Sequence, residues 1–126
     1  MSNLVVSNIS DGTTTVGTGY VVNGSAKAWI HYNGSSATIA ESNNISSATD
    51  NGTGDYTAYI SNDMTSSTYV AINFVAGGDD RRAAHSARDE LVAGSWNLIC
   101  RSAVVADNNA LTDENKVMGA VFGDLA

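Results

Sequence analysis

The sequence predicts an all-β fold, an antiparallel β-sandwich of jelly-roll-like type with a short N-terminal arm. Several segments alternate apolar and polar residues with a period of two, as half-buried strands do. Ser, Thr, Asn and Gly supply 51 of the 126 residues, whereas Pro and Gln are absent, and this composition is typical of strands joined by many turns. Hydrophobic residues make up 43% of the chain, so disorder is excluded, and a coiled coil would need a different composition. A chain of this length forms one domain.

The first hairpin is expected early in this domain. Residues 26–32 alternate in polarity, which indicates a half-buried strand. Its apolar face consists of Ala26, Ala28, Ile30 and Tyr32. Trp29 falls on the opposite face. The Asn33-Gly34 pair that follows tolerates the positive φ of a hairpin turn, and a return strand over residues 37–41 completes the hairpin.

A second hairpin is expected over residues 50–61. The Asn51-Gly52 pair lies in a polar, turn-like stretch, and residues 55–61 alternate in polarity after it. The apolar face of this strand consists of Tyr56, Ala58 and Ile60. Tyr59 falls on the opposite face, together with two hydroxyl side chains.

Three more strands are expected in the second half of the chain. Residues 68–76 are apolar on both faces, which is typical of a central strand covered from both sides by a second sheet or by a neighbouring subunit. Residues 96–106 and 116–123 form the other two. In the former, the inward positions are Trp96, Leu98, Cys100 and Val104. The single cysteine, Cys100, is therefore expected to be a buried structural thiol rather than a reactive one.

Residues 79–94 allow two interpretations. Acidic residues at the start, a glycine at the end and alanines at helical spacing favour a short helix. Arg81 and Arg82 would lie in its first turn, and Asp89 and Glu90 in its last, so both pairs oppose the helix dipole. The charges favour a long loop or a twisted hairpin instead.

Two parts of the chain are distinguished, an N-terminal docking arm over residues 1–18 and a β-sandwich domain over residues 19–126. The apolar residues near the start of the arm are Leu4, Val5, Val6 and Ile9. An apolar strip of this size cannot form a core alone. It is therefore predicted to be a partner-binding site that docks onto the body of the domain, a neighbouring subunit or another protein.

The net charge of the chain excludes some classes of binding partner. Six basic and 13 acidic residues give a net charge of −7, and only two of the basic residues are lysines. Such a chain lacks the basic patch that binds nucleic acid and is repelled by anionic membranes, so no nucleic acid and no membrane partner is expected. The N-terminus lacks a basic region followed by an apolar run, so no secretory signal is expected and the protein is predicted to be made or assembled in a cytoplasm.

The residue patterns do not predict an enzyme, a metal site or a cofactor. The acidic turn at residues 50–55 lacks the ligand spacing of an EF-hand, so a simple hairpin turn is favoured over a calcium site. His31 is expected on a half-exposed strand face and His85 in a loop. The sequence holds no nucleophile elbow and no phosphate-binding glycine motif, and no Ser, His and acid are suggestively placed.

Two aromatic residues are candidates for contact with a ligand. Trp29 and Tyr59 fall on the less apolar faces of their strands, where they would stack on sugars or fill an interface between subunits. The alternative is that both faces are buried in a sandwich or an oligomer.

Several segments, taken in order, carry a resemblance to a known family. They are NGSAKAW (residues 23–29), the Asn33-Gly34 turn, ISS (45–47), TDNGTGDYT (49–57), NDM (62–64), the strand YVA (69–71) and VMGAVFGD (117–124). In these segments the chain resembles a tail-fibre or appendage-type β module of tailed-phage virion structural proteins, found often in phages of marine bacteria and cyanobacteria. Residues 77–94 do not match the pattern of this family.

The resemblance implies a structural protein of the virion that is assembled in the cytoplasm of a host bacterium. Members of the family are tail-fibre or unspecified virion proteins and are commonly trimeric. The implied partners are phage capsid or tail proteins and further copies of the chain, most simply as a trimer. A host surface glycan is a further implied partner for a module at a fibre tip.

Two functions therefore remain open. The first is a small, non-enzymatic β-sandwich displayed on the particle, as a capsid decoration or a short head or tail appendage attached through its arm. The alternative is a host-glycan-binding tip module of a tail fibre, with exposed aromatics stacked on sugars. An 18-residue arm can pin a small domain to a lattice but cannot hold a receptor-binding tip at a distance, which favours the first. A hydrolase acting on host polysaccharide is a more distant alternative.

Overall fold

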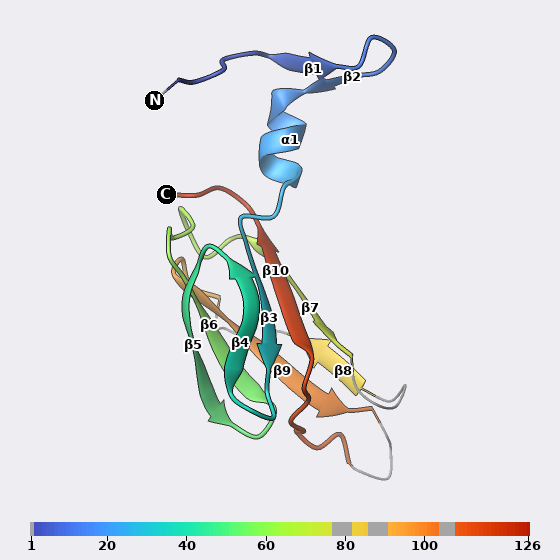
Figure 1. Ribbon diagram of the computed structural model, residues 1–126, viewed down its shortest axis with the longest axis vertical. Helices are drawn as coiled ribbons and strands as arrows, with labels where there is room; N and C mark the ends of the chain where they lie inside the picture. Colours follow the sequence, from blue (N-terminus) through green and yellow to red (C-terminus); the bar gives the residue numbers. More distant parts are fainter. Residues whose placement is uncertain (1, 77–81, 86–90, 104–107) are drawn as a thin grey trace.

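The computed structural model describes residues 2–76, 82–85, 91–103 and 108–126. Within this part of the chain, two four-stranded antiparallel sheets pack face to face, and an N-terminal arm extends from one end of them (Figure 1). The predicted all-β sandwich is confirmed. The two chain ends lie at the same end of the sandwich, on the side of the arm (Figure 1).

The first sheet has the strand order β4-β3-β10-β7. Its strands are β4 (Thr38–Asn43), β3 (Ala28–Asn33), β10 (Val117–Phe122) and β7 (Val70–Val75). The hairpin of β3 and β4 is the one that the alternating pattern predicted, with every second residue of β3 buried. The final strand, β10, inserts between β3 and β7 and is antiparallel to both.

The second sheet has the strand order β5-β6-β9-β8. Its strands are β5 (Ile45–Gly52), β6 (Asp55–Ile60), β9 (Ser95–Ser102) and β8 (Arg82–His85). The predicted turn joins β5 to β6, where Gly52 and Gly54 both adopt a positive φ. Glycine adopts this conformation without steric cost, which explains the turn chemistry.

The core lies between the sheets and is centred on Trp96 of β9, which is completely buried. Its indole N–H donates to Oδ1 of Asn73 on β7, at 3.2 Å, and Nδ2 of Asn73 donates to the carbonyl of Asn97, at 3.1 Å. These bonds join the two sheets. Gly119 of β10 faces the indole, and a Cβ there would lie 3.1 Å from Nε1 of Trp96 and 2.9 Å from Cδ2 of Leu98. A larger side chain at this position would displace the ring.

The chain passes from the first sheet to the second at Asn44, between β4 and β5. Asn44 has a φ of +55°, a left-handed conformation that Asn tolerates better than most residues. Its side chain donates to the carbonyls of Lys27 and Asn62 and accepts from the N–H of Asn62. Its own carbonyl accepts from the N–H of Ser61. One asparagine thus fastens the corner where the two sheets meet.

The opposite end of the sandwich is closed by the segment that precedes β10. Oδ1 of Asp113 accepts from the hydroxyl of Tyr56 and from the N–H of Gly54, each at 2.7 Å. The ring of Tyr56 also packs against Tyr32, with 5.0 Å between centroids. Burial, followed by the hydrogen bond to Asp113, raises the pKa of Tyr56 far above its ordinary value.

Residues 68–76 were predicted to form a central strand, covered from both sides by a second sheet or by a neighbouring subunit, and the central position is wrong. β7 is an edge strand of the first sheet, and its residues alternate between exposed and half-buried. Val70, Ile72 and Phe74 on its outer face are 61%, 39% and 58% exposed. An apolar strand face indicates that the face is suited to burial, but it does not indicate where the strand lies in its sheet. No described residue of the same chain covers the outer face of β7.

The segment 79–94 is described only in part. Arg82–His85 form strand β8, which pairs antiparallel with β9, so the helical interpretation is wrong for these residues. His85 accordingly lies in a strand and not in a loop. Residues 79–81 and 86–90 lie outside the described part, as does Val104, which was predicted to point inward. The pairing of β8 with β9 agrees with the hairpin interpretation.

One substitution tests the packing around Trp96. Gly119→Ala places a methyl group within 3.1 Å of three buried or half-buried atoms. We expect the free energy of unfolding to fall by about 1–3 kcal/mol, as overpacked cores do. Urea unfolding followed by tryptophan fluorescence measures it.

The matched control is Gly24→Ala, where no atom lies within 4 Å of the added methyl group. It should change stability by less than about 0.5 kcal/mol. Equal stability of Gly119→Ala and the unsubstituted protein would contradict the central role of this contact.

Candidate interaction site

The arm begins with a short hairpin of its own. Strands β1 (Asn8–Ser10) and β2 (Thr15–Gly17) pair antiparallel, with Ile9 opposite Val16. Oδ1 of Asp11 accepts from the N–H groups of Thr14 and Thr13 in the turn, at 2.7 and 2.9 Å. These hydrogen bonds, that from Thr14 first, lower the pKa of Asp11. Local polar contacts thus fix the turn.

A short helix, α1 (Thr18–Gly24), follows the hairpin directly. The hydroxyl of Thr18 donates to the carbonyls of Val6 and Ser7, and its N–H donates to Ser7 at 2.9 Å, so the start of the helix is tied to the start of the arm. The helix buries none of its residues. The arm was predicted to end at residue 18, where this helix begins. Because the first strand of the sandwich, β3, begins at Ala28, the helix is counted with the arm from here on, and the arm is residues 2–24.

The four residues predicted to bind a partner lie on this arm and are exposed. Leu4 and Val5 are 86% and 91% exposed, and Val6 and Ile9 are 39% and 47% exposed. Sequence analysis missed further exposed apolar residues in the same arm, which are Val16, Tyr20, Val21 and Val22. Their only sequence signal is a high apolar content beside two glycines, which does not indicate a helix. The arm therefore presents more apolar surface than expected.

The base of the arm is fixed to the sandwich through Lys27. Its N–H donates to the carbonyl of Val121 on β10, at 2.8 Å, so the backbone joins the first sheet here. Its ammonium group donates to the carbonyls of Val22 and Ser25 near the end of α1. A lysine is well placed here, because the carbonyls at a helix C-terminus lack partners within the helix.

The two candidate aromatic residues lie on different sheets. Trp29 is on the outer face of β3 and Tyr59 on the outer face of β6, and they are 36% and 39% exposed. Because the sandwich separates them, one bound sugar cannot contact both. Tyr59 lies between Ser47 and Ser95 on the neighbouring strands, in polar surroundings.

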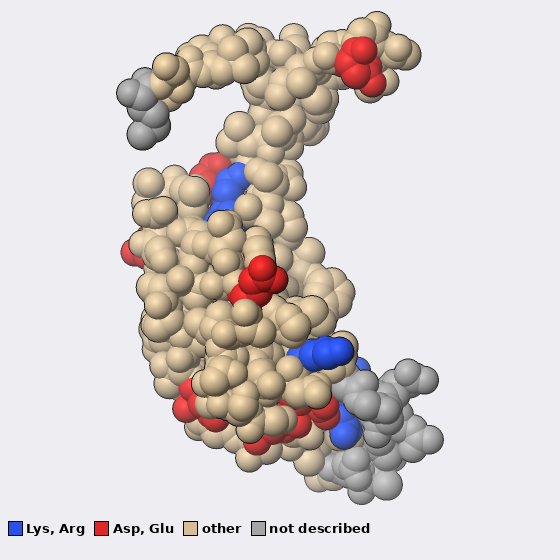
Figure 2. All heavy atoms as spheres, in the orientation of Figure 1, with Lys and Arg blue, Asp and Glu red and all other residues tan. Residues whose placement is uncertain are grey.

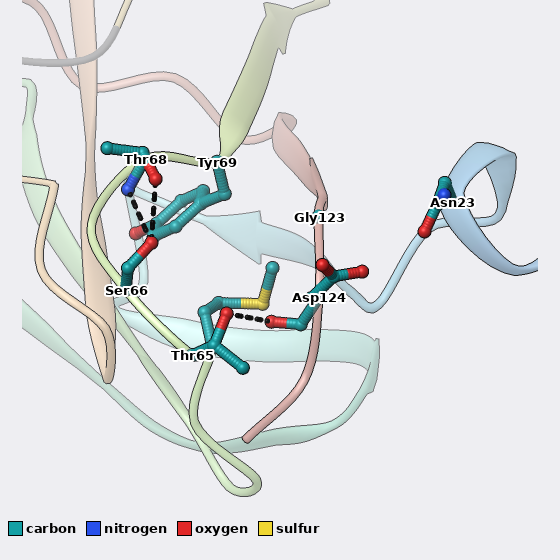
Figure 3. Close-up of a pocket in the computed structure, with 8 residues that line it drawn as sticks. Asn23, Thr65, Ser66, Thr68, Tyr69, Gly123 and Asp124 are labelled. Carbon is teal, nitrogen blue, oxygen red and sulfur yellow. Dashed lines mark hydrogen bonds between the residues drawn. The ribbon is translucent and has the colours of Figure 1, made fainter.

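A polar hollow of about 230 Å³ lies beside the base of the arm (Figure 3). It is lined by Asn23, Met64, Thr65, Ser66, Thr68, Tyr69, Gly123 and Asp124. The hydroxyl of Tyr69 donates to the carbonyls of Ser95 and Val92, at 2.7 and 3.0 Å, and the other hydroxyls shown bond to neighbours within the wall. The hollow is thus built mainly by groups that already have partners.

The groups considered for chemistry are dispersed. Where β5 ends and β6 begins, Asp50 accepts from the N–H of Gly52 and Asp55 accepts from the side chain of Asn51, as expected of a hairpin. Across the described ranges, no three His, Cys, Asp or Glu side chains gather closely enough to hold a metal ion. His31 lies half-buried on the outer face of β3, as predicted.

Cys100 is completely buried, as predicted. Burial, with a smaller contribution from nearby Glu114, raises the pKa of its thiol to about 11. At neutral pH the group is therefore a thiol and not a nucleophilic thiolate.

The buried hydroxyl of Tyr69 predicts a loss of stability in alkali. Burial raises the pKa of Tyr69 to about 12, whereas an unfolded chain has a tyrosine pKa of about 10. Its contribution is thus complete below pH 10 and is lost as the pH rises through 12. Tyr69→Phe should lower stability at pH 7, by removing the hydroxyl proton that two carbonyls share, and should flatten the fall between pH 10 and 12. Urea unfolding across this range measures both, with Ser66→Ala in the same hollow as control. An unchanged slope in Tyr69→Phe would contradict the assignment.

None of the helices in the described residues is long and apolar enough to cross a membrane.

Comparison with known proteins identifies no relative. No protein-family model matches the chain, and neither the curated proteins nor the solved structures include a significant match.

Proposed function

We propose that the chain is a non-enzymatic structural protein of a phage virion, a small β-sandwich displayed on the surface of the particle and attached through its N-terminal arm. In this proposal it is a capsid decoration or a short head or tail appendage, assembled in the cytoplasm of the host bacterium. Two supports are independent. One is the resemblance of segments within residues 23–71 and 117–124 to tailed-phage virion modules, and the other is the exposed apolar arm. The arm is the structural observation that carries the proposal.

The arm has the properties of a segment that is stabilised when it packs against another protein. A seven-residue helix and a two-stranded hairpin are each marginal in water when nothing packs against them. Docking would remove Leu4 and Val5 from water, and complete burial of such a side chain stabilises by about 1.5–3 kcal/mol. A capsid or tail protein with an apolar groove is the partner that this chemistry fits.

The second sheet is suited to face solvent or the host. Two rows on its outer face are entirely uncharged and carry hydroxyls, amides and one tyrosine. They are Ser47, Tyr59 and Ser95, and Thr49, Thr57 and Asn97. Such a surface is well hydrated, and without charges it does not strongly attract charged molecules.

One observation favours the alternative, a host-glycan-binding module. Tyr59 is exposed between hydroxyl side chains on this polar face, and an aromatic ring beside hydrogen-bonding groups is what binds sugars. Trp29 has one polar neighbour, Asn43 on β4, and on its other side its row continues into apolar Ala120 and Ile72.

The arm is tested by the double variant Leu4→Asp, Val5→Asp. Two carboxylates in place of the most exposed apolar side chains should reduce retention on the particle by at least about tenfold, since 1.4 kcal/mol corresponds to a factor of ten. The measurement is co-sedimentation of purified protein with particles that lack it.

The control is Val92→Asp, the same change at an exposed residue of the sandwich. It should be retained like the unsubstituted protein. Undiminished retention of the arm variant, or failure of the unsubstituted protein to bind particles at all, would contradict attachment through the arm.

The glycan alternative is tested by Tyr59→Ala. If Tyr59 stacks on a sugar, the variant should still join the particle, whereas binding to host cells should fall by about tenfold or more, as loss of one stacking contact predicts. Flow cytometry with labelled protein measures cell binding. Unchanged cell binding would argue against a glycan site at Tyr59.

A further inference from the structure

Asparagine is followed directly by glycine at three places in the chain, Asn23, Asn33 and Asn51. In such a pair the backbone nitrogen of the glycine can attack the side-chain carbonyl of the asparagine, because glycine has no Cβ to hinder the approach. The reaction requires a glycine nitrogen that can lose its proton and a backbone that can bend to close a cyclic imide. The fold treats the three pairs differently in both respects.

The pair at Asn33 is held on both sides. Gly34 is buried, and its N–H donates to the carbonyl of Glu114 at 2.8 Å. Oδ1 of Asn33 accepts from the N–H of Ser36 at 3.1 Å. A Cβ added at Gly34 would overlap the hydroxyl of Tyr56, so the backbone has no room to bend here. Contacts at the edge of the core would have to break before this pair could cyclise.

The pair at Asn51 is exposed, but carboxylates engage its polar groups. The N–H of Gly52 donates to Oδ1 of Asp50 at 2.9 Å, and Nδ2 of Asn51 donates to Oδ1 of Asp55 at 3.2 Å. The same Nδ2 donates to the hydroxyl of Thr57 at 2.9 Å. Attack places negative charge first on the glycine nitrogen and then on the side-chain oxygen, and two neighbouring carboxylates oppose that charge. The fold thus both restrains this pair and raises its barrier.

The pair at Asn23 has neither restraint. Its side chain is exposed at the end of α1, beside the polar hollow, and forms no hydrogen bond with another described residue (Figure 3). No atom lies within 4 Å of a Cβ added at Gly24. Both residues belong to the last turn of a seven-residue helix that buries none of its residues, and such a helix opens readily.

A cation also lies beside this pair. The ammonium group of Lys27 donates to the carbonyls of Val22 and Ser25, the residues on either side of the pair. A positive charge here stabilises the negative charge that develops during attack, the reverse of the arrangement between β5 and β6. Asp124, which lines the hollow from the side of the sandwich, forms no hydrogen bond with either residue of the pair.

We propose that Asn23 is a site of spontaneous deamidation and that it reacts first of the three pairs in the folded protein. The nitrogen of Gly24 forms a bond to Cγ of Asn23, the bond from Cγ to Nδ2 breaks, and ammonia leaves with the proton of the attacking nitrogen. Water then opens the cyclic imide at one of its two carbonyls, which leaves an aspartate or an isoaspartate at position 23. Either product carries one more negative charge than asparagine.

The modification changes the arm at the point where it joins the sandwich. A carboxylate in the last turn of α1 opposes the helix dipole, and an isoaspartate also lengthens the backbone by a methylene group. Both products therefore weaken the helix, and the new charge shares the hollow with Asp124 (Figure 3). The inference concerns the isolated chain and does not depend on the proposed function, so failure of one leaves the other intact.

The test is peptide mapping by mass spectrometry of the full chain, incubated at mildly alkaline pH and sampled over time. Deamidation raises the mass of the peptide that contains the reacted residue, and chromatography separates the aspartate and isoaspartate products. The same chain unfolded in urea gives the intrinsic rate of each pair. Relative to these rates, position 23 should convert at least about tenfold faster than positions 33 and 51 in the folded chain, a difference of about 1.4 kcal/mol in the barrier.

Two variants test the causes, and near-ultraviolet circular dichroism confirms that each is folded. Gly24→Ala hinders the attack in open surroundings, so it should slow conversion at position 23 by about tenfold or more and leave positions 33 and 51 unchanged. Asp50→Ala releases the N–H of Gly52 and removes one carboxylate, so it should speed conversion at position 51 by about tenfold.

Three results would overturn the proposal. The first is conversion at Asn33 or Asn51 that is as fast, relative to the unfolded chain, as conversion at Asn23. The second is an unmodified position 23 in the folded chain after the unfolded chain has converted. The third is conversion at position 23 that Gly24→Ala does not slow. An unchanged rate at position 51 in Asp50→Ala would likewise count against the protection on which the selectivity rests.

Discussion

The burial of Trp96 between the two sheets is the constraint on which the rest of the structure depends. The indole requires a partner for its N–H and space for its ring, since an unpaired buried donor costs about 1–3 kcal/mol. Asn73 supplies the partner and Gly119 the space, and both lie on the opposite sheet. The need to place these two residues over Trp96 accounts for β10 lying beside β7. Asn44 and Asp113 then fasten the two ends.

Once the core is closed in this way, the exposed features that stand out among the described residues are apolar surfaces. The described hydroxyls near the polar hollow are engaged with neighbours, and the buried Cys100 and Tyr56 are held in their neutral forms. Within the described part of the chain, large apolar side chains stay exposed on the arm and on the outer face of β7. A protein built from two uncovered apolar surfaces and one polar face is suited to assembly, which is the basis of the virion proposal.

The sequence was informative where one strand face is buried and the other is not. Alternation identified β3 and β6 and placed Ile30 and Ala58 in the core correctly. Periodicity does not report strand neighbours, so residues 68–76 were assigned to a central strand although β7 is at an edge. The helix α1 was missed because its apolar residues make no contact that imposes a pattern. The four arm residues could be singled out because a short apolar strip stands out before a polar turn, and their role in binding a partner stays a prediction. The exposed apolar residues on the outer face of β7 could not be predicted, because their place depends on the long-range pairing of β10 with β7.

The most direct test of the virion proposal is electron cryo-microscopy of intact particles of the phage that, on this proposal, encodes the chain. The account predicts density for the sandwich on the particle surface, with residues 2–24 in contact with a shell or tail protein and Tyr59 facing outward. Many copies on the shell would identify a decoration, and a few on the tail an appendage. Absence of the chain from purified particles would contradict the proposal.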